Sequence, residues 1–117
     1  MAMRKYIPLV LLLLSSHTFA SELRCGWLQN PTPANQWLSD KDGIWDISLQ
    51  GGYSAQGIER LKDFPDSQFV RTNGNYGYGC SCIRVDVNKN ENKIARIYSS
   101  KILPINRCKT DTALPKL

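Results

Sequence analysis

The four cysteines are the residues of this 117-residue chain whose type and spacing could carry chemistry: Cys25, Cys80, Cys82 and Cys108. An even number of cysteines in a short exported chain favours two disulfides. Cys80 and Cys82 are two residues apart in a segment that reads as a strand, so their side chains point to one face. A bond between them would distort the strand, because their Cα atoms would lie near the upper limit of about 6.8 Å for a bridge. We therefore expect Cys25 to bond one member of this pair and Cys108 the other.

The same cysteines could instead act in redox chemistry or bind a thiophilic metal. The Cys80-Ser81-Cys82 pair lacks the two-residue spacer of thiol oxidoreductases and the Cys-x-x-Cys spacing of zinc sites. We expect structural disulfides at all four positions and no bound metal or cofactor. A thiol-redox or metal-handling envelope protein that uses Cys80 and Cys82 is the alternative.

The first 20 residues have the pattern of a signal peptide. Arg4 and Lys5 form a basic start, an apolar run covers 7–14, and Ala20 is the small residue before a cleavage site near Ala20-Ser21. The apolar run is much shorter than the roughly 20 residues that span a membrane. We expect cleavage, and a periplasmic or secreted protein that has left the membrane and keeps its disulfides.

Removal of this segment leaves 97 residues as a single small domain, 21–117. It also removes the only imidazole, His17, which excludes a His–Asp triad, a Cys–His dyad and a His-ligated metal. The formal charge falls from +5 to +3 and the basic residues are scattered, so we expect no nucleic-acid partner. The alternative is that some of these basic residues form a surface patch that attracts an anionic partner. With no recognisable catalytic motif, we expect a protein that is not an enzyme.

Three aspartates with a glycine between them are similar to part of a calcium loop: Asp40, Asp42, Gly43 and Asp46. The segment lacks a third closely spaced oxygen ligand and the bidentate acid at the end of such a loop. A hairpin turn explains it better, because 44–50 alternates apolar and polar residues with the period of a half-buried strand.

These patterns predict a mainly β domain, with a small α+β domain as the alternative. We expect a compact antiparallel sheet with long irregular loops, stapled by two disulfides. The expected strands cover 36–39, 44–50, 68–72, 76–87 and 93–98. Residues 26–35 should be irregular, because Pro31 and Pro33 exclude a helix and a central strand.

Two short helical turns complete the expected fold. One lies within 57–64, with Ile58 and Leu61 facing inward. The other begins near Thr110 or Asp111 and ends at Pro115.

The stretch 73–87 has two different faces if it is a regular strand. Tyr76 and Tyr78 lie on the side of the cysteines, while Gly77 and Gly79 leave the other side bare. A run of small residues lets another group lie directly on the backbone. We expect a tryptophan to pack there, and a ligand or partner is the alternative. The candidate binding surface is therefore Trp27, Trp37, Trp45, Tyr76, Gly77, Tyr78 and Gly79.

Several short motifs resemble those of a known family: Cys25-Gly26-Trp27, Gly51-Gly52-Tyr53 and, above all, Asn73-Gly74-Asn75-Tyr76-Gly77-Tyr78-Gly79-Cys80-Ser81-Cys82. They are similar to domain-of-unknown-function family 4087, a family of small exported bacterial proteins. The resemblance spans nearly all of 21–117. It implies a bacterial envelope protein, and it implies no activity and no catalytic residues.

We therefore expect an exported, non-catalytic protein that binds another macromolecule, as small inhibitors and immunity proteins do. The expected partner is an envelope protein or a cell-wall component. Glycan binding in the cell wall through exposed tryptophan or tyrosine is a further alternative.

Overall fold

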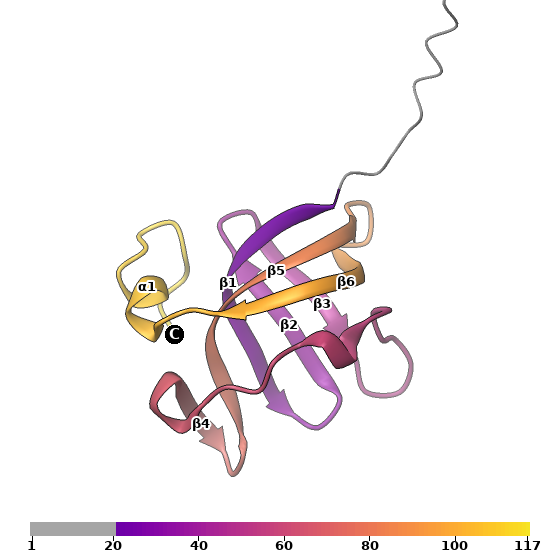
Figure 1. Cartoon of the computed structure of the whole chain (residues 1–117). Coiled ribbons are helices and arrows are strands. Elements are labelled where there is room, and N and C mark those ends of the chain that lie inside the picture. Colours follow the sequence, from indigo (N-terminus) through magenta and orange to yellow (C-terminus); the bar gives the residue numbers. More distant parts are fainter. Residues whose placement is uncertain (1–20) are drawn as a thin grey trace, which may run out of the picture.

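The computed structural model describes residues 21–117, and the expected signal peptide lies outside the described residues. Within that range the domain is mainly β, with six strands and short helical turns (Figure 1). In chain order the elements are β1 (Glu22–Thr32), β2 (Asn35–Asp40), β3 (Gly43–Ser48), η1 (Ile58–Arg60), η2 (Asp66–Gln68), β4 (Phe69–Asn73), β5 (Tyr76–Asn88), β6 (Lys93–Ile102) and α1 (Ile105–Lys109).

Five of the strands close into a barrel in the order β1-β2-β3-β6-β5, because β1 also pairs with β5. Neighbouring strands are antiparallel except β3 and β6, which are parallel. A ring of five strands cannot alternate direction all the way round, so one pair at least must be parallel. The expected antiparallel sheet is thus a mixed one. Its strand order and single parallel pair are those of an OB-type barrel, a small Greek-key barrel that is partly open.

The seam between β3 and β6 is closed by a separate piece of chain. The two strands meet directly only at Asp46 and Lys93. Farther along, the backbone of residues 55–56 lies between them. The Ala55 N–H donates to the Ile47 carbonyl at 2.8 Å, and the Ile97 N–H donates to the Gln56 carbonyl at 2.8 Å. This short insertion satisfies backbone groups that an open seam would leave unpaired.

The prediction of an irregular segment at 26–35 is wrong for most of its length. β1 covers Glu22–Thr32 and is a central strand, with β2 on one edge and β5 on the other. The two prolines do not interrupt these ladders. Pro31 lies in the irregular stretch where the register with β2 shifts, and Pro33 follows the end of the strand. Prolines are tolerated at such positions because no ladder bond needs their missing N–H.

The other predicted elements are confirmed to within a few residues. The hairpin forms from β2 and β3, and Ile58 and Leu61 of the expected helical turn pack against the core. At the C-terminal end the expected turn forms at Asp111, whose carbonyl accepts from the Leu114 N–H at 3.2 Å and whose side chain accepts from the Ala113 N–H at 2.9 Å. The helix α1, which starts directly after Pro104, was not predicted. Proline just before or at the first helical position is favourable, because that position needs no N–H bond.

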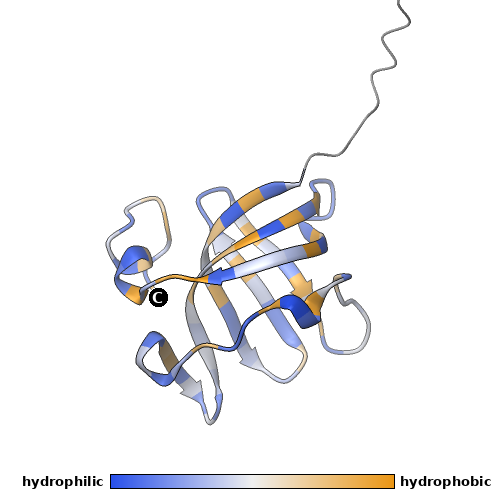
Figure 2. Ribbon diagram, viewed as in Figure 1, coloured by the Kyte–Doolittle hydropathy of each residue, from blue (hydrophilic) through white to orange (hydrophobic). Residues whose placement is uncertain are grey.

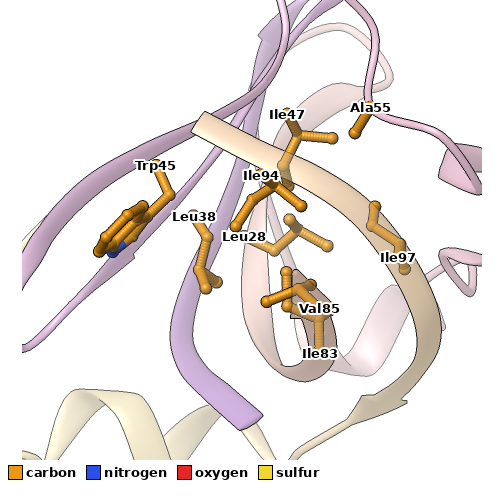
Figure 3. Packing of buried hydrophobic residues seen from close by; sticks show 9 residues of the cluster. All are labelled: Leu28, Leu38, Trp45, Ile47, Ala55, Ile83, Val85, Ile94 and Ile97. Carbon is orange, nitrogen blue, oxygen red and sulfur yellow. The ribbon is translucent and has the colours of Figure 1, made fainter. Parts of the chain in front are cut away.

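The barrel interior is a single apolar cluster to which all five barrel strands contribute (Figure 3). Its members are Leu28, Leu38, Trp45, Ile47, Ala55, Ile83, Val85, Ile94 and Ile97. Colouring by hydropathy shows apolar and polar residues alternating along the strands, as a closed barrel requires (Figure 2). Ile94 and Ile97 are three apart and yet both fully buried, because one of the two register shifts between β5 and β6 falls between them.

A second, smaller apolar cluster lies outside the barrel, between β1, β5 and the C-terminal segment. Trp27 and Cys80 come from the strands, and Leu103, Cys108 and Leu114 come from the segment that covers them. The outer surface of the sheet is therefore shielded from solvent at Trp27 and Cys80. The covering segment includes α1, which stands beside the barrel (Figure 1).

The disulfides follow the predicted pattern, with each terminal cysteine bonded to one member of the central pair. Cys25 bonds Cys82, and Cys80 bonds Cys108. The first bridge joins directly opposed residues of β1 and β5, and the second attaches the C-terminal segment to β5.

The predicted tryptophan over the bare face of β5 is absent, so that prediction is wrong. The ring of Phe64 lies over Gly79, where an added Cβ would be 2.4 Å from its Cε1 atom. At Gly77 a Cβ would be 1.8 Å from the Val70 carbonyl oxygen of β4. The glycines allow β4 and the preceding loop to fold onto β5 at a distance that no side chain would permit.

We predict that Gly77→Ala lowers the free energy of unfolding by about 1–3 kcal/mol, because the backbone of β4 must move to admit a methyl group. Gly52→Ala is the matched control, since an added Cβ there meets no atom within 4 Å. Its effect should stay within about 0.5 kcal/mol. Denaturant unfolding of residues 21–117 measures both. Equal stabilities of the two variants would contradict the packing of β4 on Gly77.

Candidate functional site

A row of side chains crosses the outside of four neighbouring strands. Trp37 of β2 is opposite Gln29 of β1, which is opposite Tyr78 of β5, which is opposite Val70 of β4. All four are only half-buried. Directly opposed residues project to the same face of a sheet. The row therefore presents aromatic groups at two points of one broad surface, which we call the aromatic row.

Hydrogen bonds fix the central residue of the aromatic row. The Gln29 side-chain oxygen accepts from Trp37 Nε1 at 2.9 Å and from Ser39 Oγ at 2.6 Å. The indole of Trp37 is thus held against the sheet without being buried. A rigid aromatic side chain loses little conformational entropy on binding, which makes it a favourable contact group.

A hollow of about 390 Å³ lies next to the aromatic row, between the sheet and the C-terminal segment. Its wall is the pair Trp27 and Tyr78, whose rings meet edge to face at 5.2 Å. Trp27 Nε1 donates to the Pro115 carbonyl at 2.9 Å, which ties the segment down. The hollow is lined by apolar, hydroxyl and charged side chains of that segment, including Leu117, Thr110, Lys109 and Asp111. It could take an aliphatic or aromatic group of a partner.

The structure brings together only part of the predicted binding surface. Trp27, Trp37 and Tyr78 share the outer face, and Tyr76 lies two residues farther along the same side of β5. Gly77 and Gly79 are buried and covered, so they offer nothing to a ligand. Trp45 belongs to the barrel core. Sequence reasoning missed Gln29 and Val70, because only strand pairing places them beside the aromatic residues.

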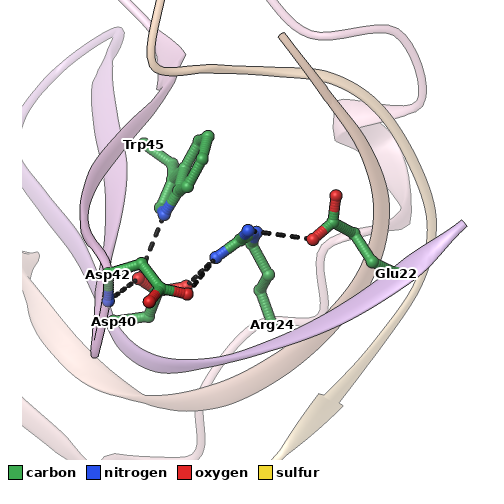
Figure 4. Close-up of polar contacts among 5 residues, drawn as sticks. All are labelled: Glu22, Arg24, Asp40, Asp42 and Trp45. Atoms are coloured by element: carbon green, nitrogen blue, oxygen red, sulfur yellow. Dashed lines mark hydrogen bonds and ion pairs between the residues drawn. The ribbon is translucent and has the colours of Figure 1, made fainter. Parts of the chain in front are cut away.

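Trp45 takes part in a polar cluster at one end of the barrel (Figure 4). The Arg24 guanidinium lies 4.0 Å from the centre of the Trp45 ring and pairs with Asp40 at 2.7 Å, Glu22 at 2.8 Å and Asp42 at 3.1 Å. Trp45 Nε1 also donates to Asp40 at 3.0 Å. The predicted hairpin turn at 40–43 is confirmed, and Asp40 and Asp42 bind an arginine there.

The charge of Arg24 is stabilised despite its burial. Burial by itself lowers the pKa of Arg24, but the hydrogen bonds that Arg24 donates to Asp40 and Asp42, together with the negative charges of Asp40 and Glu22, outweigh that effect and leave the pKa raised. The guanidinium is therefore charged at neutral pH. This cluster closes one end of the barrel and has a structural role, because its charges face one another.

The opposite end of the barrel holds a more polar hollow of about 420 Å³. The stacked rings of Phe64 and Phe69 form part of its wall. Arg71, one of its two basic residues, already pairs with Asp66 at 2.9 Å and donates to Asn75 at 2.6 Å. Because the arginine of this hollow is already paired within the protein, we take the aromatic row as the candidate site.

The sequence model of the family described as "Protein of unknown function (DUF4087)" matches residues 19–115. The chain belongs to this family. No curated protein matches the chain, and no solved structure matches it. Among the described residues, no helix is both long and apolar enough to cross a membrane.

We predict that Asp40→Asn destabilises the domain by on the order of 3 kcal/mol, because it removes a buried partner of Arg24. The side chain of Asp40 is 2% exposed in its pair with Arg24. Asp66→Asn is the control, since that side chain is 88% exposed in its pair with Arg71. Its loss should stay below about 1 kcal/mol. Thermal and denaturant unfolding measure both, and similar losses would refute the structural role of the Arg24 cluster.

Proposed function

We propose that residues 21–117 form an exported, non-catalytic binding protein that holds a segment of another envelope protein on its aromatic row. The observation that carries this proposal is the alignment of Trp37, Gln29, Tyr78 and Val70 across four strands, half-exposed and beside an apolar hollow. Aromatic side chains supported by a rigid sheet are typical centres of protein interfaces.

The expected location is the periplasm or the extracellular space. Two disulfides suit an oxidising compartment, and a domain of this size commonly depends on such links. The signal-peptide pattern of residues 1–20 supports the same location.

A binding role is favoured over catalysis by the residues available. Residues 21–117 contain no histidine. The buried charged residues at one end of the barrel neutralise one another around Arg24. The aromatic row itself offers contact area and hydrogen-bonding groups.

Glycan binding is a second candidate, supported by Trp37 alone among the tryptophans. Trp27 and Trp45 are buried at 3% and 6% exposure, so neither can stack on a sugar. The half-exposed indole of Trp37 lies beside the Gln29 amide, a combination that could serve a sugar ring.

We predict that Trp37→Ala and Tyr78→Ala each weaken partner binding by at least about thirtyfold, because central aromatic residues contribute about 2 kcal/mol or more to interfaces. Tyr98→Ala is the matched control, since Tyr98 is an exposed tyrosine on β6, away from the aromatic row. Melting temperatures of the three variants show that each still folds.

The partner is captured from envelope extract on immobilised residues 21–117 under non-reducing conditions, identified by mass spectrometry and then titrated as a pure protein. Loss of its affinity in both row variants but not in Tyr98→Ala supports the proposal. Equal affinities for all variants would refute it. Retention by purified cell-wall polysaccharide that depends on Trp37 would replace the protein partner with a glycan.

A further inference from the structure

The two disulfides differ in their exposure to solvent, although only Ser81 separates Cys80 of one bridge from Cys82 of the other. Cys80 and Cys108 are 0% and 4% exposed and belong to the apolar cluster under the C-terminal segment. Cys25 is exposed and Cys82 is half-buried, so the bridge between them can be reached from solvent. Exposed disulfides are the ones that commonly exchange with thiols, whereas buried ones resist.

Basic side chains surround the Cys82 end of the exposed bridge. Lys101 of β6 is directly opposite Cys82, on the edge of β5 that does not face Cys25. Arg84 follows Cys82 by two residues on the same face. Arg107 of α1 lines a small hollow that all four cysteines border, so its charge lies near both bridges. None of these three residues forms a salt bridge with any of the described residues.

The Cys25 end has different electrostatic surroundings. Cys25 borders a second hollow, of about 320 Å³, that holds acidic groups as well as basic ones. Those residues are Glu22, Asp40, Asp42 and Asp111, with Arg24 and Lys41. Asp111 also borders the small hollow near Arg107. The hollow at Cys25 thus holds four carboxylates and two cations, and three of the carboxylates pair with Arg24. By contrast, Lys101 and Arg84, which flank Cys82 on its face of the sheet, are cationic and form no salt bridge with the described residues.

We propose that Cys25–Cys82 is a thiol-exchanging disulfide, in which an external thiolate attacks the exposed Cys25 sulfur and Cys82 leaves as a thiolate. The new bond joins the external sulfur to Cys25, and the bond between Cys25 and Cys82 breaks with its electron pair on Cys82. A second external thiolate then attacks the external sulfur of this mixed disulfide and releases Cys25 as a thiolate. Two external thiols are thereby oxidised to a disulfide, and the protein disulfide is reduced to two thiols.

The physical reason lies in the leaving group. Nearby cations stabilise a thiolate and lower the pKa of its thiol, and a thiol of low pKa leaves faster. Lys101, opposite Cys82, and Arg84, two residues after it, act on Cys82 in this way. The barrel tolerates the open bridge, because β1 stays paired with β5 from Glu22 opposite Val85 to Asn30 opposite Gly77. This inference does not depend on the proposed partner binding.

The selectivity of reduction is the first test. Folded residues 21–117 are incubated with β-mercaptoethanol without denaturant, alkylated at intervals and mapped by mass spectrometry. Cys25 and Cys82 should be alkylated at least about tenfold faster than Cys80 and Cys108, and the trapped β-mercaptoethanol adduct should be on Cys25. Simultaneous opening of both bridges, earlier opening of Cys80–Cys108, or an adduct mainly on Cys82 would overturn the proposal.

The asymmetry between the two sulfurs is the second test. Cys25→Ser leaves Cys82 as a thiol, and Cys82→Ser leaves Cys25, so the pH dependence of alkylation gives the pKa of each. Cys82 should ionise below the usual value of about 8.5, and Cys25 should not. A Cys82 pKa at or above that of Cys25 would exclude the assigned leaving group.

A charge variant separates this effect from general destabilisation. Lys101→Gln in the Cys25→Ser background should raise the Cys82 pKa, and in the otherwise unchanged protein it should slow reduction by β-mercaptoethanol several-fold. Lys41→Gln is the matched control, because it removes the same charge from the hollow that Cys25 borders. Equal effects of the two substitutions would refute the role of the cations beside Cys82.

Discussion

β5 holds the fold together because it pairs with β1 along one edge and with β4 and then β6 along the other. Its inward side chains are small in the first half of the strand, at Gly77, Gly79 and Ser81, and large in the second half, at Ile83 and Val85. At the glycine end, β4 and Phe64 lie directly on the backbone. At the aliphatic end the strand forms the wall of the barrel core. The change from small to large inward side chains along β5 thus separates the part that β4 and Phe64 cover from the part that lines the barrel core.

The outward side chains of β5 decide what the rest of the chain can do. Tyr78 joins the aromatic row, Cys80 holds the C-terminal segment, Cys82 bonds Cys25, and Arg84 stays charged and exposed. Four consecutive outward positions therefore serve four different tasks. The inward positions pack the barrel core or lie under β4 and Phe64, so substitutions there disturb the fold.

Sequence reasoning identified what is local and periodic. Alternation in 44–50 and in 76–87 gave strands that match β3 and β5 closely, and the two-residue spacing of Cys80 and Cys82 led to the observed pattern of bonding. It failed where pairing partners are distant in sequence. The two prolines led to the wrong prediction for β1, because a proline interrupts a strand only where its missing N–H is needed for a ladder bond. Phe64 over Gly79 could not be predicted, since any aromatic residue in a loop could fill that space. The Arg24 cluster was missed because its acidic residues looked like a turn or a calcium loop.

The aromatic row and the exposed disulfide lie on the same outer face, and the C-terminal segment lies between them. Gln29 and Cys25 are four residues apart on β1, which corresponds to about 13 Å along a strand. Between Gln29 and Cys25 on β1 lies Trp27, which is opposite Cys80 of β5. Both residues are buried beneath the C-terminal segment, and the Cys80–Cys108 bridge fixes that segment to the sheet. Because the buried Cys80–Cys108 bridge still holds the C-terminal segment in place, opening the exposed Cys25–Cys82 bridge does not have to disturb the aromatic row. The separation allows one small domain to combine a fixed contact surface with a chemically reactive position.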